Sequence, residues 1–291
     1  MTLLPACAAD LPLSIGSCAT LACLLEATAP KPGNVHRGAD FADMGFTDFV
    51  VSAAAIGPVL ERAAERGVGP TVLEAVRATR RLVPVNTNLG TVLLLAPLAA
   101  APRTEPLARG VPQVLAGLTA RDAEDVYAAI RLAQPAGLGT TDEMDVAGTA
   151  PPSLLAAMAA AASRDMVARQ YAEGFTHVLQ TVAPWIVDGC AAGWTLTDAV
   201  IHTQLRLLVA YPDSLIARKC GRQTAERAAA IAQRVLNAGE PGDEDYFAEL
   251  GELDFWLRSD GHLRNPGTTA DLIAAGLFVV LREGLVRPPY R

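Results

Sequence analysis

The chain has little lysine, few aromatic residues and no long apolar run. Only two of its 291 residues are lysines, Lys31 and Lys219, so arginine supplies nearly all of the positive charge. Aromatic residues make up 5% of the sequence, whereas 51% of it is hydrophobic, with alanine and leucine dominant. This balance favours helices packed through small side chains over sheets built from aromatic and β-branched residues. We therefore predict an all-α fold.

Further absences disfavour several classes of protein. The longest apolar run, Val92 to Ala101, is far shorter than the ~20 residues that span a bilayer, and no Lys or Arg precedes Lys31 to form the basic start of a secretory signal. The net charge of -7 disfavours a nucleic-acid partner, because phosphate affinity depends on clustered Lys and Arg. The five cysteines form no Cys-x-x-Cys pair, and the P-loop, Rossmann and α/β-hydrolase motifs are missing. We expect a cytoplasmic protein with no membrane or nucleic-acid partner, and we leave open whether it forms a homo-oligomer.

Helical periodicity runs through most of the chain. The pattern predicts a helix from Leu11 to Ala27, a second from Thr47 to about Arg66 and a third from Pro70 to about Val83. The apolar run that starts at Thr91 is typical of a buried helix at the centre of a bundle. No alternating strand pattern of comparable length appears, so we predict that residues 1–291 form one multi-helix domain.

One long segment, Gln134 to Ser153, has no periodicity and is rich in Gly, Pro and Thr. A loop of this size inside a compact domain is usually a functional lid, a disordered segment or a domain linker. Helical patterns of the same character lie on both sides, which favours a lid within one domain. We expect this segment to be mobile without ligand and to become ordered when a nucleotide binds.

Four polar segments lie at predicted helix ends, where a bundle could bring them together at one mouth. They are Lys31–Met44, Asn86–Gly90, Asp213–Gly221 and Asn265–Asp271. Prolines and glycines within and just before the first segment exclude a regular helix there, so it is interpreted as a shaped loop that carries polar side chains. Such loops are where binding and catalytic residues are often placed.

The acidic residues of these segments have two readings each. Asp40 and Asp43, three positions apart, could hold Mg²⁺ against phosphate oxygens, or they could simply cap the next helix. Thr268 and Asp271 fit a capping box. The Pro-Gly before Thr268 also leaves free N–H groups at a helix start, which suits an anion.

Other residues have a functional and a plain reading as well. Glu26, at the end of an apolar helix, could be a ligand or a base, or a solvated helix-end glutamate. His36 is the histidine that lies within a dense polar motif, which favours acid–base work, although lone histidines are more often structural. Arg218 and Lys219 could contact an anion or be solvated surface charges.

Taken together, the polar motifs resemble those of the triphosphoribosyl-dephospho-CoA synthase family, in the family's order and over nearly the whole chain. The matching stretches are Pro30–Val35, Gly38–Asp40 with Asp43–Met44, Asn86–Gly90 and Asn265–Leu272. The resemblance implies an all-helical enzyme that joins ATP to 3′-dephospho-CoA, releases adenine and leaves a triphosphoribosyl group on the acceptor's ribose 2′-hydroxyl. In the family, the product is the prosthetic-group precursor of the acyl carrier protein of citrate lyase or malonate decarboxylase.

Two stretches depart from the family's pattern. Asn-Thr-His-Lys-Gly is replaced by Asn86-Thr87-Asn88-Leu89-Gly90, and Ser-Pro-Gly-Gly-Ser-Ala-Asp is replaced by Asn265-Pro266-Gly267-Thr268-Thr269-Ala270-Asp271. These changes indicate a divergent branch. A related ATP-dependent ribosyl or phosphoribosyl transfer in a folate-like one-carbon cofactor pathway is therefore an alternative.

The implied reaction assigns roles to the candidate residues. Breaking an N-glycosidic bond builds positive charge on the ribose while the triphosphate stays anionic, so the site needs a metal ion and cations. We expect Mg²⁺ to be held by Asp40, Asp43 and Asp271. Substrate contacts are expected from Lys31, Arg37, Asn86, Asn88, Arg218, Lys219 and Thr268. A general base must take the proton of the attacking hydroxyl, and this role stays open between Glu26, His36 and Asp43.

Two readings of other classes remain. An isoprenoid-synthase-like enzyme also combines a helical bundle with Asp-held Mg²⁺, and Asp142 to Asp145 could pass for its motif. That enzyme class would carry paired acidic motifs within long helices, whereas this segment lies in a Gly/Pro loop. A non-catalytic helical binding protein is the other reading, and it would leave the four polar helix-end motifs unexplained.

Overall fold

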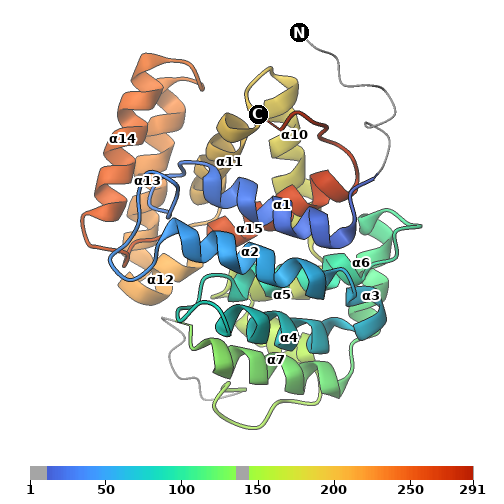
Figure 1. Ribbon diagram of the computed structural model, residues 1–291. Helices are drawn as coiled ribbons and strands as arrows, with labels where there is room; N and C mark the ends of the chain where they lie inside the picture. Colours follow the sequence, from blue (N-terminus) through green and yellow to red (C-terminus); the bar gives the residue numbers. More distant parts are fainter. Residues whose placement is uncertain (1–11, 136–143, 291) are drawn as a thin grey trace.

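The computed structural model describes residues 12–135 and 144–290, and every regular element within these ranges is helical (Figure 1). The helices of the first half are α1 (Ile15–Thr28), α2 (Phe46–Leu60), α3 (Ala63–Arg66), α4 (Val68–Arg80), α5 (Leu89–Ala100), α6 (Leu107–Ala116) and α7 (Ala120–Ala133). The prediction of an all-α fold is confirmed. The described cysteines are free thiols.

The second half continues the helical bundle. Its helices are α8 (Leu154–Ala161), α9 (Met166–Ala172), the π-helical turn η2 (Val178–Val182), α10 (Ala183–Ala191), α11 (Leu196–Ala210), α12 (Ser214–Cys220), α13 (Arg222–Ala238), α14 (Glu244–Arg258) and α15 (Gly267–Arg282). Within the described ranges, no helix combines the length and the apolar character that a bilayer crossing requires.

Two helices, α5 and α15, form the centre of the bundle and pack against each other (Figure 1). In α5, the run from Val92 to Ala99 is buried on every side, and α15 is buried almost continuously from Leu272 to Arg282. A helix that is apolar all round must be covered on all its faces. The interpretation of the run after Thr91 as a central helix is therefore confirmed.

The outer layer next to this centre is made by α1 and α2, which cross at close distance. Gly16 and Gly57 lie at the crossing, where an added Cβ on Gly16 would overlap the Gly57 carbonyl and one on Gly57 would overlap the Thr20 hydroxyl. The small residues therefore let the two backbones approach. As α1 also packs on α15, this contact fixes where the end of α1 and the loop after it lie.

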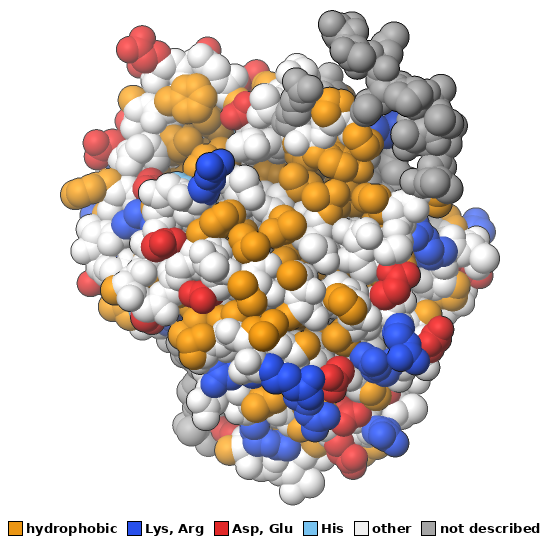
Figure 2. All heavy atoms as spheres, in the orientation of Figure 1, with side chains coloured by type: hydrophobic (Ala, Val, Ile, Leu, Met, Phe, Trp, Pro, Cys, Tyr) orange, Lys and Arg blue, Asp and Glu red, His pale blue; other side chains and the backbone are white. Residues whose placement is uncertain are grey.

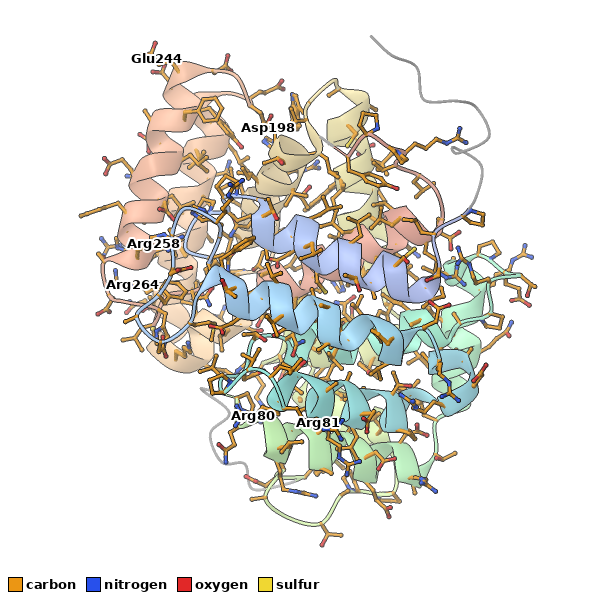
Figure 3. All side chains as sticks on the ribbon, in the orientation of Figure 1. Arg80, Arg81, Asp198, Glu244, Arg258 and Arg264 are labelled. Carbon is orange, nitrogen blue, oxygen red and sulfur yellow. The ribbon has the colours of Figure 1, made fainter. Side chains whose placement is uncertain are left out.

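A second, smaller hydrophobic cluster lies under α11 to α14. The helices α13 and α14 stand as a pair at the edge of the molecule, with Glu244 and Arg258 near the two ends of α14 (Figures 1 and 3). Tyr246, Leu253 and Leu257 turn inward from α14. The C-terminal end of this helix reaches the loop that follows α1.

Several helix boundaries differ from the sequence expectation. The first helix starts at Ile15 because the Ser14 side chain accepts a hydrogen bond from the Ser17 N–H, and it ends at Thr28; Leu11 lies outside the described residues. Thr47 does not cap the second helix, since Gly45 occupies that position and Asp48 completes the cap. Pro70 lies in the first turn of α4, where its missing N–H costs no helical hydrogen bond.

Surface charge is mixed in sign. Over the part of the surface formed by α4, arginines alternate with acidic residues (Figure 2), and Glu74 pairs with both Arg77 and Arg81. A phosphate backbone would need an uninterrupted basic field, and this face does not offer one.

Of the segment predicted to be a lid, residues 136–143 lie outside the described residues. Its later part is tied to α7, where the Tyr127 hydroxyl donates to the Met144 carbonyl.

Candidate functional site

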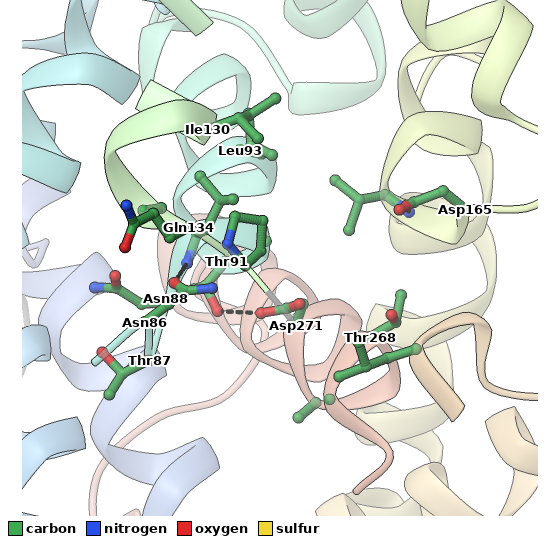
Figure 4. A pocket seen from close by; sticks show the side chains of 18 of the residues that line it. Asn86, Thr87, Asn88, Thr91, Leu93, Ile130, Gln134, Asp165, Thr268 and Asp271 are labelled. Carbon is green, nitrogen blue, oxygen red and sulfur yellow. Dashed lines mark hydrogen bonds between the residues drawn. The ribbon is translucent and has the colours of Figure 1, made fainter. Parts of the chain in front are cut away.

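A cavity of about 540 Å³ opens where the ends of several helices meet. Its walls come from α5, α7, α8, α9, α12 and α15 and from the loop after α1, so all four polar segments contribute to it. Figure 4 shows Asn86 and Asn88 on one side of this space and Asp165 and Thr268 on the other, with Thr91 hydrogen-bonded to Asp271 between them. Residues as far apart in the sequence as Asn34 and Asn265, which are separated by 231 positions, are thereby joined at one site.

The start of the loop after α1 serves mainly to build this junction. Asn34 donates through its amide to the Asn265 side chain at 2.7 Å and accepts from Gln204 at 2.9 Å. The Gly33 N–H donates to Asp254 on α14 at 2.7 Å, and a Cβ at Gly33 would collide with Leu257. The Pro-Gly-Asn sequence is therefore explained by close packing and hydrogen bonding to the start of α15.

Lys31 does not reach the cavity, contrary to its expected contact with phosphate. Its side chain is fully buried, with 0% exposed, and its ammonium lies 2.8 Å from the Glu26 carboxylate. It also donates to the carbonyls of Glu26 and Ala29. Glu26 in turn lines the cavity. Lys31 therefore contacts the site through Glu26.

Three further residues of the loop lie outside the cavity. Asp40 accepts a hydrogen bond of 2.6 Å from the N–H of Phe46, the first residue of α2, so the capping interpretation describes it. The ring of His36 accepts from the Gly38 N–H at 3.2 Å, and burial together with Arg258 lowers its pKa. Arg37 is exposed. The expected roles of Asp40, His36 and Arg37 in metal binding, proton transfer and phosphate binding do not fit these positions.

Asp43, by contrast, lines the cavity from the end of the same loop. Its carboxylate lies 3.2 Å from Nδ1 of His262, and it is half exposed. In Figure 3, Arg258 and Arg264 lie beside this loop. Arg258 holds it in place by donating to the Asn34 carbonyl and stacking over Phe41 at 5.5 Å. Asp43 therefore stands at the edge of the cavity on a braced loop.

The start of α5 presents small polar side chains to the cavity. Asn86 accepts from the Leu89 N–H at 3.1 Å and so caps the helix. Asn88 donates to Thr79 at 3.1 Å, and Thr87 shares a 2.6 Å hydrogen bond with Ser52. These bonds fix the first turn of α5, whose free N–H groups and dipole favour negative charge.

Asp271 is the central acidic residue of the cavity. Its carboxylate accepts a 2.6 Å hydrogen bond from Thr91 (Figure 4), and a Cβ on Gly90 would overlap its other oxygen. Because α15 begins at Gly267, Thr268 and Asp271 do not form the expected capping box. Burial raises the pKa of Asp271 to about 7, and the negative charge of Glu26 adds to this effect.

A buried carboxylate, Asp213, joins the starts of α12 and α15. One of its oxygens caps α12 by accepting from the Leu215 and Ile216 N–H groups, and the other accepts from the Thr269 N–H and hydroxyl. Burial raises the pKa of Asp213 in spite of these bonds. Thr268, next to it, accepts from the Ser214 hydroxyl at 3.1 Å and lines the cavity.

Positive charge enters the cavity mainly from α12. Arg218 donates to Asp165 at 2.7 Å, and Lys219 donates to the His262 carbonyl at 3.3 Å. Burial lowers the pKa of Lys219. Sequence reasoning missed two more arginines of the lining, Arg80 at the end of α4 and Arg164 between α8 and α9, because neither lies within one of the four polar segments.

Apolar side chains line the part of the cavity farthest from Thr268, where Leu93 and Ile130 lie together in Figure 4. Leu154 and Met158 of α8 and Val167 of α9 are further apolar residues of the lining. Sequence reasoning assigned no role to these residues because they are indistinguishable from core positions. The cavity therefore has a polar end at the helix starts and an apolar end between α5, α7, α8 and α9.

The donors for a metal ion can be tested against this geometry. Of the expected ligands, Asp43 and Asp271 line the cavity and Asp40 does not. Within the described ranges, no group of three or more His, Cys, Asp or Glu side chains is arranged to hold an ion. Mg²⁺ bound with a nucleotide commonly takes one or two carboxylates and completes its shell with phosphate oxygens and water. The residues present therefore fit an ion that arrives with a polyphosphate, and they do not form a preformed cage.

Comparison with known proteins agrees with the motifs. Residues 12–288 match the family model described as ATP:dephospho-CoA triphosphoribosyl transferase. A protein of Pseudomonas syringae pv. tomato described as a probable 2-(5''-triphosphoribosyl)-3'-dephosphocoenzyme-A synthase is 30% identical over 127 residues, which are 43% of each chain. The alignment thus spans less than half of that relative.

A solved structure provides the match in three dimensions. The crystal structure of an Archaeoglobus fulgidus protein described as a triphosphoribosyl-dephospho-CoA synthase has 28% sequence identity and a TM-score of 0.62, and the match covers 81% of this chain and 99% of that one. The family match runs through α1 to α15 and includes every segment that meets at the cavity. The chain therefore belongs to the ATP:dephospho-CoA triphosphoribosyl transferase family.

Proposed function

We propose that this protein transfers the triphosphoribosyl group of ATP to the ribose 2′-hydroxyl of 3′-dephospho-CoA and releases adenine. The observation that carries the proposal is the convergence of the family's motifs on one cavity. A binding protein without catalytic function would not require the acidic residues Glu26 and Asp271 to face the same space as Arg218 and Lys219.

The polar end of the cavity suits the triphosphate. The starts of α5 and α15 both meet there, and N–H groups at helix starts favour bound anions. Arg218 and Lys219 add positive charge from α12, and Arg164 adds more from the residues just before α9. With the triphosphate at this end, the ribose would lie near Asp271, and the apolar end would receive an uncharged part of a substrate.

Mg²⁺ is the metal that this arrangement would accept. Asp271 and Asp43 are the residues of the expected set that could ligate it, together with the phosphate oxygens. When bound, the ion would neutralise triphosphate charge and orient the chain of phosphates. The missing Cβ of Gly90 leaves the space that the Asp271 carboxylate itself occupies at the start of α5.

Glu26 and Asp43 are the candidates for general base that line the cavity. Asp43 lies at the half-exposed edge, next to His262, whereas Glu26 is only 8% exposed. A base that is shielded from bulk water can activate the acceptor hydroxyl while solvent water is kept from competing as the nucleophile. The burial of Glu26 therefore favours it for this role.

The acceptor is the least constrained part of the proposal. Asn88 and Leu89 line the cavity where the family's usual pattern has His and Lys. Since the loss of two groups that can carry positive charge reduces attraction for an anionic acceptor, transfer to an acceptor of the one-carbon cofactor type is the second candidate.

Mass spectrometry of the reaction products tests the proposal. The protein is incubated with ATP, Mg²⁺ and a panel of acceptors that includes 3′-dephospho-CoA, CoA and pterin or folate analogues. We expect free adenine and a product whose mass equals the acceptor plus ATP minus adenine. Diphosphate release with intact adenosine would instead show cleavage within the triphosphate. Either that result or ATP consumption without an acceptor adduct would reject transferase activity.

A further inference from the structure

We propose that Lys31 is a positioning residue that holds Glu26, the general base of the transfer, in place. This inference rests on the proposed function and assigns the two residues separate roles within the same site. It replaces the phosphate contact that the sequence suggests for Lys31.

All of the donors of Lys31 are directed away from substrate. Its ammonium pairs with Oε1 of Glu26 at 2.8 Å and donates to the Glu26 carbonyl and to the Ala29 carbonyl at 3.4 Å. An ammonium group has three N–H donors, so these three acceptors account for all of them. With no exposed surface, Lys31 has neither a free donor nor a path to a phosphate.

Glu26 has the opposite arrangement. Its Oε1 is held by Lys31, and Oε2 accepts no hydrogen bond from any residue in the described part of the chain. The side chain lines the cavity and is near enough to Asp271 for its negative charge to raise the pKa of that carboxyl. One oxygen is therefore fixed, while the other remains available on the cavity side.

The energetics favour a functional reason for this pair. A carboxylate in a poorly hydrated position stays charged only when a partner compensates it. A buried ion pair, however, adds little net stability compared with apolar residues of similar size, because both charges lose their hydration. An ion pair kept beside the cavity is better explained by the need for a negative charge there.

The transfer step balances with Glu26 as the base. The acceptor's O–H bond breaks and its proton passes to Oε2 of Glu26 while the oxygen bonds to C1′ of the ATP ribose. The C1′–N9 bond breaks, and adenine leaves with the electron pair. The proton held by Glu26 then returns, directly or through water, to adenine. No oxidant, reductant or further reactant is needed.

A double-mutant cycle tests the inference. Glu26→Gln keeps the size of the side chain but removes the base, so kcat should fall about a hundredfold or more. Lys31→Met keeps the apolar stem but leaves Glu26 unpaired, so kcat should fall about tenfold or more, with KM for ATP changed less than about threefold. If Lys31 acts through Glu26, the double variant should be no slower than Glu26→Gln alone, because the two residues act as a unit.

Two controls separate this outcome from misfolding and from failure of the proposed function. The double variant removes the pair as a whole and should melt close to the wild type. Calorimetric titration with Mg-ATP should give Lys31→Met the wild-type affinity, whereas Lys219→Ala binds more weakly. Losses that multiply in the double variant, or weakened ATP binding in Lys31→Met, overturn the positioning role. A wild-type protein that releases no adenine rejects the proposed function, and the inference with it.

Discussion

The loop from Lys31 to Met44 and the paired starts of α5 and α15 are both rich in polar residues, but they contribute differently to the cavity. The loop carries Lys31, Arg37, Asp40 and Asp43, and of these charged side chains Asp43 alone lines the cavity. The two helix starts contain a single charged residue, Asp271, and most of their small polar side chains line the cavity.

The difference lies in what holds each segment. The loop contains only backbone turns and the His36–Ala39 bridge, so polar side chains are also needed to fix its shape. Asp40 caps α2, Asn34 is bound to Asn265 and Gln204, and Lys31 is paired with Glu26. The helix starts already have a defined backbone and leave N–H groups unpaired within the helix. The many charged residues of the loop therefore serve to fix its shape, whereas the helix starts, which have few charges, provide the groups that can bind a ligand.

The largest effect should come from removing the charged residue of the helix starts. Asp271→Asn keeps the size of the side chain and the contact with Thr91 but removes the negative charge. Losing a positioned electrostatic contact of this kind should cost roughly 3 kcal/mol of transition-state stabilisation, about a hundredfold in kcat. The measurement is the rate of adenine release, with thermal melting as the control for folding. A fully active and equally stable variant would remove Asp271 from the site.

The approach of the two helix starts can be disturbed directly with Gly90→Ala. The added Cβ would overlap the Asp271 carboxylate, so we expect about a tenfold loss of kcat and a decrease of about 1–3 kcal/mol in the free energy of unfolding. Gly251→Ala in α14 is the matched control, because a Cβ there meets no atom within 4 Å. That change should leave activity unaltered and stabilise its helix slightly. Equal behaviour of the two variants would contradict the close approach of Gly90 and Asp271.

The assignment of phosphate contacts separates the two regions further. Lys219→Ala should raise KM for ATP about tenfold with little change in kcat, because a contact present in both ground and transition states is uniform binding. Arg37→Ala, on the exposed part of the loop, should change neither constant. Steady-state kinetics at several ATP concentrations give both values. A larger effect on KM for Arg37→Ala than for Lys219→Ala would indicate that the triphosphate binds at the loop instead.

Asp271 should also make the stability depend on pH when metal and nucleotide are absent. The pKa of Asp271 is about 7 in the folded protein and about 3.9 in an unfolded chain. The unfolded state therefore releases its proton first, and the free energy of unfolding due to this group falls as pH rises from about 4 to about 7. Asp271→Asn should gain stability relative to the wild type across this window, as measured by melting temperature. A difference that does not vary with pH would show that the carboxyl is not buried in this way.

Much of the fold was predictable from the sequence. The all-α class and the central position of α5 follow from alanine- and leucine-rich periodicity and from the continuous apolar run, which are local properties. Boundaries were less accurate where a side chain outside the repeating pattern decides them. Ser14 starts α1, and Gly45 with Asp48 starts α2, although Thr47 has a capping preference similar to that of glycine.

The site was predictable as a set of segments but not residue by residue. Asn86, Asn88, Arg218, Lys219 and Thr268 reach the cavity as expected, since each lies at a helix end that faces the bundle's mouth. Lys31 and Asp40 do not line the cavity, because Lys31 is paired with Glu26 and Asp40 accepts a hydrogen bond from the Phe46 N–H. Whether a polar residue contacts its own segment or a ligand depends on loop geometry, and spacing along the chain does not determine it.

A crystal structure of the protein with Mg-ATP tests the central claim most directly, because ATP should remain intact without an acceptor. We predict that the triphosphate lies at the starts of α5 and α15, with phosphate oxygens within hydrogen-bonding distance of Arg218 or Lys219 and the ribose beside Asp271. A triphosphate bound to Arg37 on the outside of the loop, with the cavity free of nucleotide, would contradict the account.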